Sequence, residues 1–359
     1  MPKWLHKFFN SPSILRYAAK KSSSTRATGL EEMTISMLQG HEGYQKDELD
    51  ELIFFLKHHE KPDVVHLSNA LLLGLAKKIR EELNIPVVCS LQDEDVWVDV
   101  MDEPYRSRIW KMMGEKANDT DALIAVSNYF ADQMKRKMNL PEDKLHVVPI
   151  GVDPSKYAVN TPNLEIPTIG FLSRSNTENG FEILVDAFIL LKDNSKFKNA
   201  RLKVTGGKTS DDDKFINKQL KKLRVKGYQN DIEFIEDFRT EALSNFFNGL
   251  TLLSVPVIDG EAFGLYQIES LASGIPIVQP ALGAFPEIVE TTGGGFIYSP
   301  NTSNALAKKL EEVLTNSYQI SNMSANGRKA VLDKYNTNHL IQKMISVYSN
   351  AISKYSNTI

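Results

Sequence analysis

Short apolar runs alternate with longer amphipathic stretches from residue 62 onward. The runs are rich in Val, Ile and Leu, and the stretches between them repeat apolar residues every three or four positions. This alternation predicts parallel βαβ units, in which each helix connects two strands of one sheet. The first set of predicted strands covers residues 62–69, 85–91, 122–126 and 145–153.

A second set of strands follows a turn-rich stretch that suits a hinge between two domains. These strands lie within residues 168–173, 200–206, 232–237, 250–257, 275–283 and 294–300. We therefore predict an α/β protein with two Rossmann-like, doubly wound domains, the N-terminal one incomplete. The predicted domains are 1–153 and 154–335, followed by a helix within 336–359 that packs back on the first domain.

The first 60 residues depart from this alternation. They contain a helical repeat of Leu49, Leu52, Ile53 and Leu56, but no convincing strand. The first domain therefore shows only four predicted strands, which is few for a sheet of the nucleotide-binding type. A sheet that lacks its first strands exposes a strand edge, so we expect either a pairing liability or a protein partner that completes the sheet.

The composition restricts the classes of function. The chain has 359 residues, of which 42% are hydrophobic and 24% charged, and its formal net charge is -3. These values are typical of a soluble two-domain protein and provide no field of one sign for nucleic acid. The only cysteine, Cys89, allows neither a disulfide framework nor a thiolate metal site, so we expect a cytoplasmic location.

The sequence predicts no membrane-spanning segment. The longest uncharged apolar stretch, residues 70–76, is too short to cross a bilayer and is flanked by Lys77 and Lys78. The N-terminal segment 1–21 mixes aromatic and basic residues without a signal-peptide pattern. It favours a packed surface helix pair, while a peripheral contact with the inner face of a membrane stays open.

The most informative stretch is EAFGLYQIE at 261–269, which follows a predicted strand and opens a predicted helix. The free backbone N–H groups of Phe263, Gly264 and Leu265 predict an anion site at the helix start, most simply for phosphate. Glu261 and Glu269 flank this site, and a carboxylate beside a bound phosphate is suited to accept hydrogen bonds from hydroxyl groups. The pattern therefore predicts a site for a nucleoside diphosphate sugar. The alternative is that both glutamates are ordinary solvated carboxylates.

This stretch resembles the donor site of the GT-B glycosyltransferases of family 4, which carry E-x-F-G-L-x-x-x-E before a helix that ends in glycine and proline. Residues 261–276 match that pattern, and further matches lie at 62–69, 122–153, 181–188 and 283–300. The resemblance implies retaining transfer of a sugar from a nucleoside diphosphate donor. It also implies that the protein binds no metal ion or other cofactor.

Carried over by position, the resemblance assigns a role to each matching residue. Glu269 holds the ribose hydroxyls and Glu261 the hydroxyls of the donor sugar, while residues 263–265 offer backbone contacts to sugar and phosphate. Arg174 matches the arginine that binds the diphosphate, and its guanidinium would stabilise the leaving group as negative charge develops. The predicted catalytic residues are therefore Arg174 and Glu261.

The chain also departs from the family pattern. The family usually has a lysine about five residues after the arginine, where this chain has Asn179. Lys208, which follows Gly206 after a predicted strand, is the candidate replacement on the donor side. Gln92 stands where a histidine usually faces the donor sugar, and Asp93 beside it offers a second acceptor-side contact.

A further departure concerns the beginning of the chain. The strand at 62–69 normally follows two or three βα units, so about 50 to 80 residues of sheet are missing by the usual lengths of such units. We expect that Met1 corresponds to an internal methionine of a longer ancestral chain.

Three hypotheses follow. The first is a retaining glycosyltransferase that acts on an unidentified acceptor, which is a sugar, a lipid-linked group or a small molecule. The second is a catalytically weak nucleotide-sugar-binding partner of another glycosyltransferase. The third, an epimerase or phosphorylase on the same fold, has fewer matching residues behind it.

Overall fold

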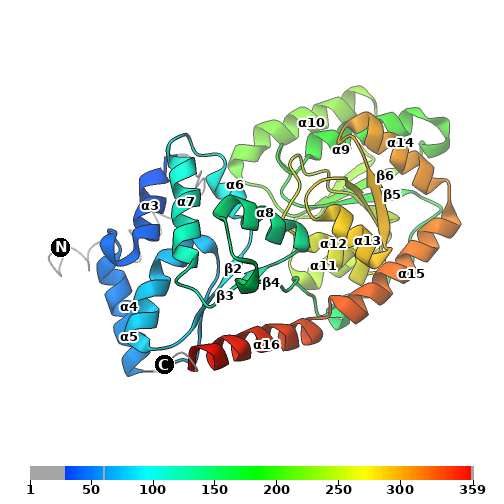
Figure 1. Cartoon of the computed structure of the whole chain (residues 1–359). Helices are drawn as coiled ribbons and strands as arrows, with labels where there is room; N and C mark the ends of the chain where they lie inside the picture. Colours follow the sequence, from blue (N-terminus) through cyan, green and yellow to red (C-terminus); the bar gives the residue numbers. More distant parts are fainter. Residues whose placement is uncertain (1–28, 60, 357–359) are drawn as a thin grey trace.

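The computed structural model describes residues 29–59 and 61–356, and it contains two parallel β-sheets flanked by helices (Figure 1). The predicted α/β fold class with two parallel sheets is confirmed. The basic N-terminal segment 1–21 lies outside the described residues.

The first sheet has four parallel strands in the order β1-β2-β3-β4. Its side chains alternate between two faces, as the twofold period of a strand requires. Cys89 and Leu123 belong to the hydrophobic core on one face, while Val88 and Ile124 belong to a separate core on the other. The strands are β1 (Val65–Leu67), β2 (Val87–Leu91), β3 (Ala122–Ala125) and β4 (Leu145–Val147).

The helices that connect these strands pack on one face of the first sheet. Ile79, Met113 and Phe130, one from each main connecting helix, lie in the same core as Cys89. Strands that follow one another in chain order, joined by right-handed crossovers, place their helices on one side. The elements are η2 (Ala70–Leu75), α5 (Ala76–Leu83), α6 (Glu94–Val98), α7 (Tyr105–Ala117) and α8 (Asn128–Met138), with α3 (Glu31–Gln39), η1 (Gly40–Glu42) and α4 (Lys46–His58) beyond them.

The C-terminal helix α16 (Thr337–Ser356) covers the opposite face of the first sheet. Its Val347 and Ala351 are buried in the core that contains Val88 and Ile124. Figure 1 shows α16 running beneath the first sheet, so the last described helix returns from the second half to the first. Within the described chain, the three-residue strand β1 forms one edge of this sheet.

The second sheet has six parallel strands in the order β10-β9-β8-β5-β6-β7. The strand order reverses between β5 and β8, which are neighbours although the chain leaves them toward opposite edges. The strands are β5 (Thr168–Leu172), β6 (Arg201–Thr205), β7 (Ile232–Phe234), β8 (Leu252–Leu253), β9 (Ile277–Pro280) and β10 (Gly295–Tyr298). The helices are α9 (Phe181–Asp193), α10 (Asp213–Val225), α11 (Thr240–Phe247), α12 (Leu265–Ala272), α13 (Phe285–Thr292), α14 (Ser303–Leu314) and α15 (Ser317–Lys334).

Two crossings connect the halves, and they lie side by side. The Val152 N–H donates to the Tyr335 carbonyl at 2.9 Å, and the Thr337 N–H donates to the Val152 carbonyl at 2.9 Å. This bridge joins the first crossing, after β4, to the second crossing, between α15 and α16. Because both crossings meet at one place, they form the natural hinge of the molecule.

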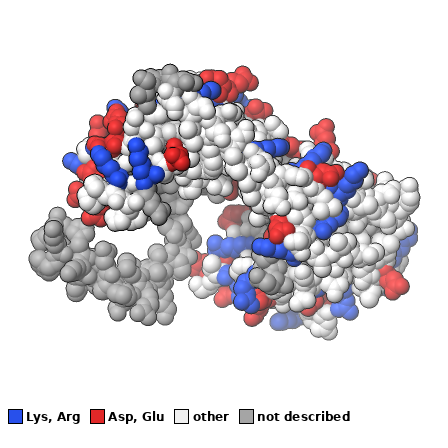
Figure 2. Space-filling model, turned by 90° about the horizontal axis from the view of Figure 1, so that it is seen from below, with Lys and Arg blue, Asp and Glu red and all other residues white. Residues whose placement is uncertain are grey.

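Figure 2 shows acidic and basic side chains interspersed over the face that carries α16, with no large area of one sign among the described residues there. Such a surface gives nucleic acid no continuous positive field. Within residues 29–59 and 61–356, no helix is both long enough and apolar enough to cross a membrane.

Candidate active site

The carboxyl ends of β5 and β8 meet where the strand order of the second sheet reverses. In open parallel sheets, ligands bind at such a reversal, outside the carboxyl ends of the strands. Arg174 lies two residues after β5, and the loop 258–264 lies between β8 and α12. The structure therefore brings the two predicted parts of the donor site to the same edge of the sheet.

The loop 258–264 ends at Gly264, which has a positive φ of 78° and stands directly before α12. A Cβ atom at this position would lie 2.8 Å from the Gln267 Nε2 atom and 2.9 Å from the Glu261 Oε2 atom, so only glycine fits without a shift. No side chain of the described residues caps α12. The first N–H groups of the helix are therefore available to an anion.

Glu261 lies close to this helix start and is partly buried. Burial, reinforced by the negative charge of Asp93 across the gap between the halves, raises the pKa of Glu261 to about 7. Phe263 is only 4% exposed, so its ring belongs to the core and only its backbone can meet a ligand. Leu265, in contrast, is exposed at the first position of the helix.

Glu269 lies on α12, one turn beyond the helix start, and faces the hinge. Its Oε1 atom accepts a hydrogen bond of 2.9 Å from the hydroxyl of Tyr157, which follows the first crossing. Burial raises the pKa of Glu269. The carboxylate lines a cavity of about 410 Å³ together with Leu265, Lys156 and Thr337. The two glutamates therefore have different neighbours, because Glu269 bonds to Tyr157 at the hinge and Glu261 lies near Asp93 of the first half.

Arg174 is held in a fixed geometry. Its Nε and Nη2 atoms donate to the two carboxylate oxygens of Asp212 at 2.7 and 3.0 Å, and Nη2 also donates to the Thr209 hydroxyl at 2.8 Å. Burial would raise the pKa of Asp212, but the hydrogen bonds from Arg174 and Thr209 outweigh it and lower that pKa. Sequence patterns do not reveal this pair, because the two residues are 38 positions apart.

Asn179 shapes the loop that carries Arg174. Its side-chain amide donates to the Arg174 carbonyl at 3.0 Å, and its N–H donates to the Asn176 side chain at 2.9 Å. It therefore supports the backbone where the family usually places a cation. Lys208, the predicted replacement, is paired with the exposed carboxylate of Asp213 at 2.9 Å and is itself 60% exposed. Gly206 packs so closely on Ser173 that a Cβ atom would lie 2.5 Å from the Ser173 backbone.

A cavity of about 420 Å³ opens beside this loop, at the carboxyl ends of β6 and β7. Its lining includes Ser175, Thr205, Gly207, Lys208 and Glu236. Of these residues, only Lys208 was predicted from the sequence to belong to the donor site. The strands that precede these residues were predicted, so their shared edge was the signal that could have identified the cavity.

Gln92 and Asp93 lie in the first half, and their side chains contact different halves of the molecule. The Gln92 side chain donates to the Ser68 carbonyl at 2.8 Å on the exposed surface. Asp93 has a positive φ of 59°, and its carboxylate lies near the N–H of Ala262 in the loop of the other half. Burial, and next the charge of Asp95, raises the pKa of Asp93, and the Ala262 N–H partly offsets this rise. Asp93 therefore contacts the donor loop, whereas Gln92 is engaged with its own half.

Glu94 is more deeply buried than either neighbour, so it does not belong to a solvated acidic turn. It is 2% exposed, and its Oε1 atom accepts a hydrogen bond of 2.8 Å from the Ala70 N–H. Its Oε2 atom has no partner within the described chain. Burial raises its pKa to about 7. No group of three or more Asp, Glu, His or Cys residues in the described part could hold a metal ion.

The fold and the site define a class of protein with two parallel α/β sheets and an uncapped helix start at the carboxyl edge of the second sheet. Two family models agree with this architecture: Glycosyltransferase Family 4 matches residues 42–156, and Glycosyl transferases group 1 matches residues 155–330. The matches adjoin at the hinge and together cover both sheets. The chain belongs to this family of glycosyltransferases.

Individual relatives are distant in sequence but similar in fold. An uncharacterized glycosyltransferase of Methanocaldococcus jannaschii is 21% identical over 82% of this chain and 76% of its own. The HepE protein of Anabaena, solved in complex with UDP, has a TM-score of 0.73 at 16% identity, over 84% of this chain and 82% of that one. A sucrose-phosphate synthase of Thermosynechococcus elongatus has a TM-score of 0.72 at 18% identity, over 87% and 80%.

Proposed function

We propose that the protein transfers a sugar from a nucleoside diphosphate sugar to an acceptor, with retention of configuration at the anomeric carbon. The observation that supports it most is the uncapped start of α12 between Glu261 and Glu269, at the reversal of strand order. The retaining outcome rests on the family resemblance. UDP in the Anabaena relative supports the class of donor but not its base or sugar in this chain.

In this proposal the diphosphate binds at the start of α12, where backbone N–H groups favour an anion. The Nη1 atom of Arg174 forms no hydrogen bond within the described chain, so it is available to the phosphate oxygens. The Asp212 pair holds the guanidinium in place, which means that little reorganisation is needed during reaction. When the bond between the anomeric carbon and the diphosphate breaks, Arg174 and the helix start stabilise the leaving charge.

The two glutamates bind hydroxyl groups on either side of the diphosphate. Glu269 would exchange the hydroxyl of Tyr157 for those of the ribose, at little net cost because one hydrogen bond replaces another. Glu261 would accept hydrogen bonds from the donor sugar, with Asp93 beside it. The cavity of about 420 Å³ next to Ser175 is the proposed place for the nucleobase, since it adjoins Arg174. An acceptor oxygen then bonds to the anomeric carbon, and its proton is released.

Calorimetric titration with UDP, GDP and ADP tests the donor class. At least one is expected to bind the wild-type protein, and Glu269→Ala is expected to weaken it by at least about tenfold, because hydrogen bonds from buried hydroxyls to a charged group are lost. Glu290→Ala is the matched control, because Glu290 is exposed on α13 and has no partner within the described chain. Absence of binding for all three nucleotides would contradict the proposal.

The second hypothesis, a catalytically weak binding partner, shares the donor site and differs in turnover. Two observations favour keeping it: Asn179 supplies no cation beside Arg174, and the edge strand β1 has only three residues. Release of UDP from UDP-sugars by the purified chain, at a rate that depends on Arg174, would exclude it. We further propose that the donor site needs no metal ion, so EDTA is expected to leave nucleotide binding unchanged. A cytoplasmic location and peripheral membrane contact remain proposals.

A further inference from the structure

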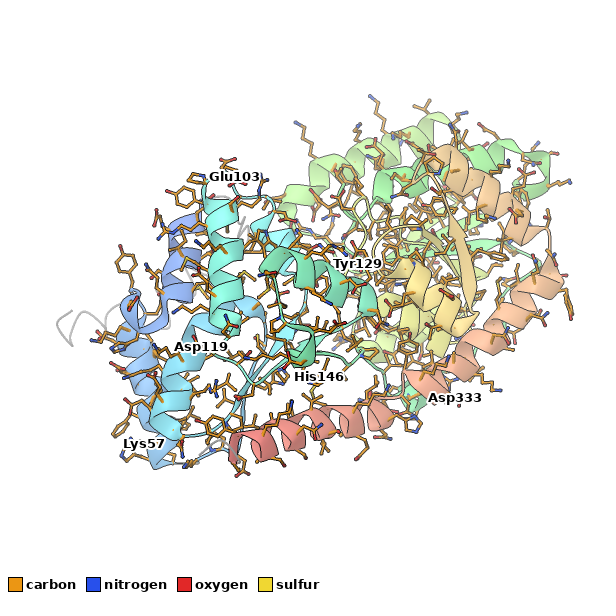
Figure 3. The ribbon with its side chains drawn as sticks, in the orientation of Figure 1. Lys57, Glu103, Asp119, Tyr129, His146 and Asp333 are labelled. Carbon is orange, nitrogen blue, oxygen red and sulfur yellow. The ribbon has the colours of Figure 1, made fainter. Side chains whose placement is uncertain are left out.

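The start of α8 is closed by a side chain from the other half of the molecule. The Asn128 N–H and side-chain amide donate to the Glu287 Oε1 atom at 3.1 and 2.8 Å, and the Tyr129 N–H donates to Oε2 at 3.0 Å. Glu287 lies in the first turn of α13, and Figure 3 shows Tyr129 on the side of the first half that faces the second sheet. A carboxylate therefore fills the anion site that this helix start offers.

A second bond joins the same helix start to the donor loop. The Ser127 hydroxyl accepts a hydrogen bond of 3.0 Å from the Phe130 N–H and donates one of 2.6 Å to the Ala262 carbonyl. Ser127 is only 1% exposed, so this bond is shielded from water. The Ala262 N–H lies near the Asp93 carboxylate and partly offsets the rise in the pKa of Asp93 that burial causes. The backbone of Ala262, the residue after Glu261, therefore contacts the first half through its hydrogen bond with Ser127 and its proximity to Asp93.

A third bond connects the loop to α13 itself. The Ala284 N–H, directly before α13, donates to the Glu261 carbonyl at 3.0 Å. Gly283 approaches so closely that a Cβ atom there would lie 2.5 Å from the Glu261 N and O atoms. Glu287 is therefore linked to the backbone of Glu261 through the first turn of α13 and the hydrogen bond of Ala284.

We propose that Glu287 and Ser127 are positioning residues that hold the two halves together and thereby set the loop 258–264 for the donor. The inference rests on the proposed function, because that loop is the proposed donor site. If the halves separate, the start of α8 loses the Glu287 carboxylate, and Ala262 loses its hydrogen bond to Ser127 and its contact with Asp93. Closure and donor binding then favour each other by the same factor, as linkage requires.

The test compares Glu287→Gln, Glu287→Ala and Ser127→Ala with the wild-type protein and with Glu290→Gln, the exposed carboxylate on the same helix. Small-angle scattering without nucleotide measures the radius of gyration, and calorimetry measures the affinity for UDP. Loss of the contacts is expected to enlarge the radius of gyration and to weaken UDP binding by roughly 5- to 150-fold, the range of ordinary coupling. Glu290→Gln is expected to leave both values unchanged.

The two readouts separate failure of this inference from failure of the proposed function. If the wild-type protein binds UDP but the Glu287→Gln and Ser127→Ala variants keep its radius of gyration and affinity, the positioning role is wrong. If the wild-type protein binds no nucleotide, the proposed function fails, and scattering still decides whether Glu287 holds the halves together. Circular dichroism identifies a variant that has not folded. Glu287→Gln is included because it keeps the shape of the side chain and so is expected to disturb folding least.

Discussion

Helices α12 and α8 begin at comparable places in the two sheets, yet within the described chain only the first N–H groups of α12 lack a side-chain partner. Each follows the carboxyl end of a parallel strand, β8 and β3 respectively. Gly264 precedes α12 and provides no side-chain cap. Ser127 precedes α8 and caps it, and Glu287 accepts hydrogen bonds from the remaining N–H groups at that start. Two helix starts at comparable places thus have different uses, because the residues at each start decide whether protein or ligand satisfies the free N–H groups.

The largest effect is expected at the cation that serves the free helix start. Arg174→Ala should lower the rate of UDP release from a UDP-sugar by roughly 10²- to 10³-fold, since a preorganised donor to the leaving group is lost. Arg201→Ala is the control, because Arg201 is an exposed arginine that pairs with Asp231 at 3.3 Å. Arg174→Lys keeps the charge and the partner of Asp212. Equal rates for Arg174→Ala and wild type would show that Arg174 does not stabilise the leaving group.

The next effect is the pH dependence of stability that Glu261 causes. The Glu287 carboxylate accepts three hydrogen bonds, whereas Glu261 is dominated by burial, which raises its pKa. The pKa of Glu261 is raised from 4.5 to about 7, so the folded state holds its proton more tightly than the unfolded state. The associated stability is complete below pH 4.5 and is lost as the pH rises through 7, by about 3 kcal/mol at most. In urea unfolding from pH 4.5 to 8, Glu261→Gln should flatten this decline. An unchanged pH profile would contradict the raised pKa.

A smaller effect, on UDP affinity, is expected when a side chain is added at the uncapped start of α12. Gly264→Ala places a Cβ atom at a φ of 78° and within 2.9 Å of the Glu261 carboxylate, so UDP affinity should fall about 30-fold. Gly227→Ala is a matched control, because Gly227 has a φ of 79° and open space around it. Both variants carry the same backbone strain, so calorimetry isolates the crowding at Glu261. A similar UDP affinity in both variants would argue against the predicted donor position.

The smallest effect concerns the missing cation. Asn179→Lys should raise the rate of UDP release about tenfold, because a second positive charge then faces the diphosphate beside Arg174. Asn179→Ala removes the bond to the Arg174 carbonyl without adding charge, and it should lower the rate slightly. If both substitutions lower the rate equally, the role of Asn179 is confined to the loop that it supports.

The order of strands and helices could be predicted from the sequence, but the ends of some strands could not. The predicted strand at 145–153 ends at Val147, because Val152 pairs with the second crossing instead. The predicted strand at 250–257 is reduced to Leu252 and Leu253, since the Val255 N–H donates to the Gln279 side chain. In both places a partner distant in sequence takes the backbone group, and periodicity cannot detect such a partner.

The sequence by itself determined the alternation of strands and helices, the glycine at the start of α12 and the two glutamates around it. These depend on local rules, namely the period of side chains and the conformations that glycine permits. Only the tertiary structure decided that Arg174 pairs with Asp212, that Tyr157 bonds to Glu269, and that Glu287 closes α8 from the other half. Each of these joins residues at least 38 positions apart, and the folding of the whole chain brings them within hydrogen-bonding distance.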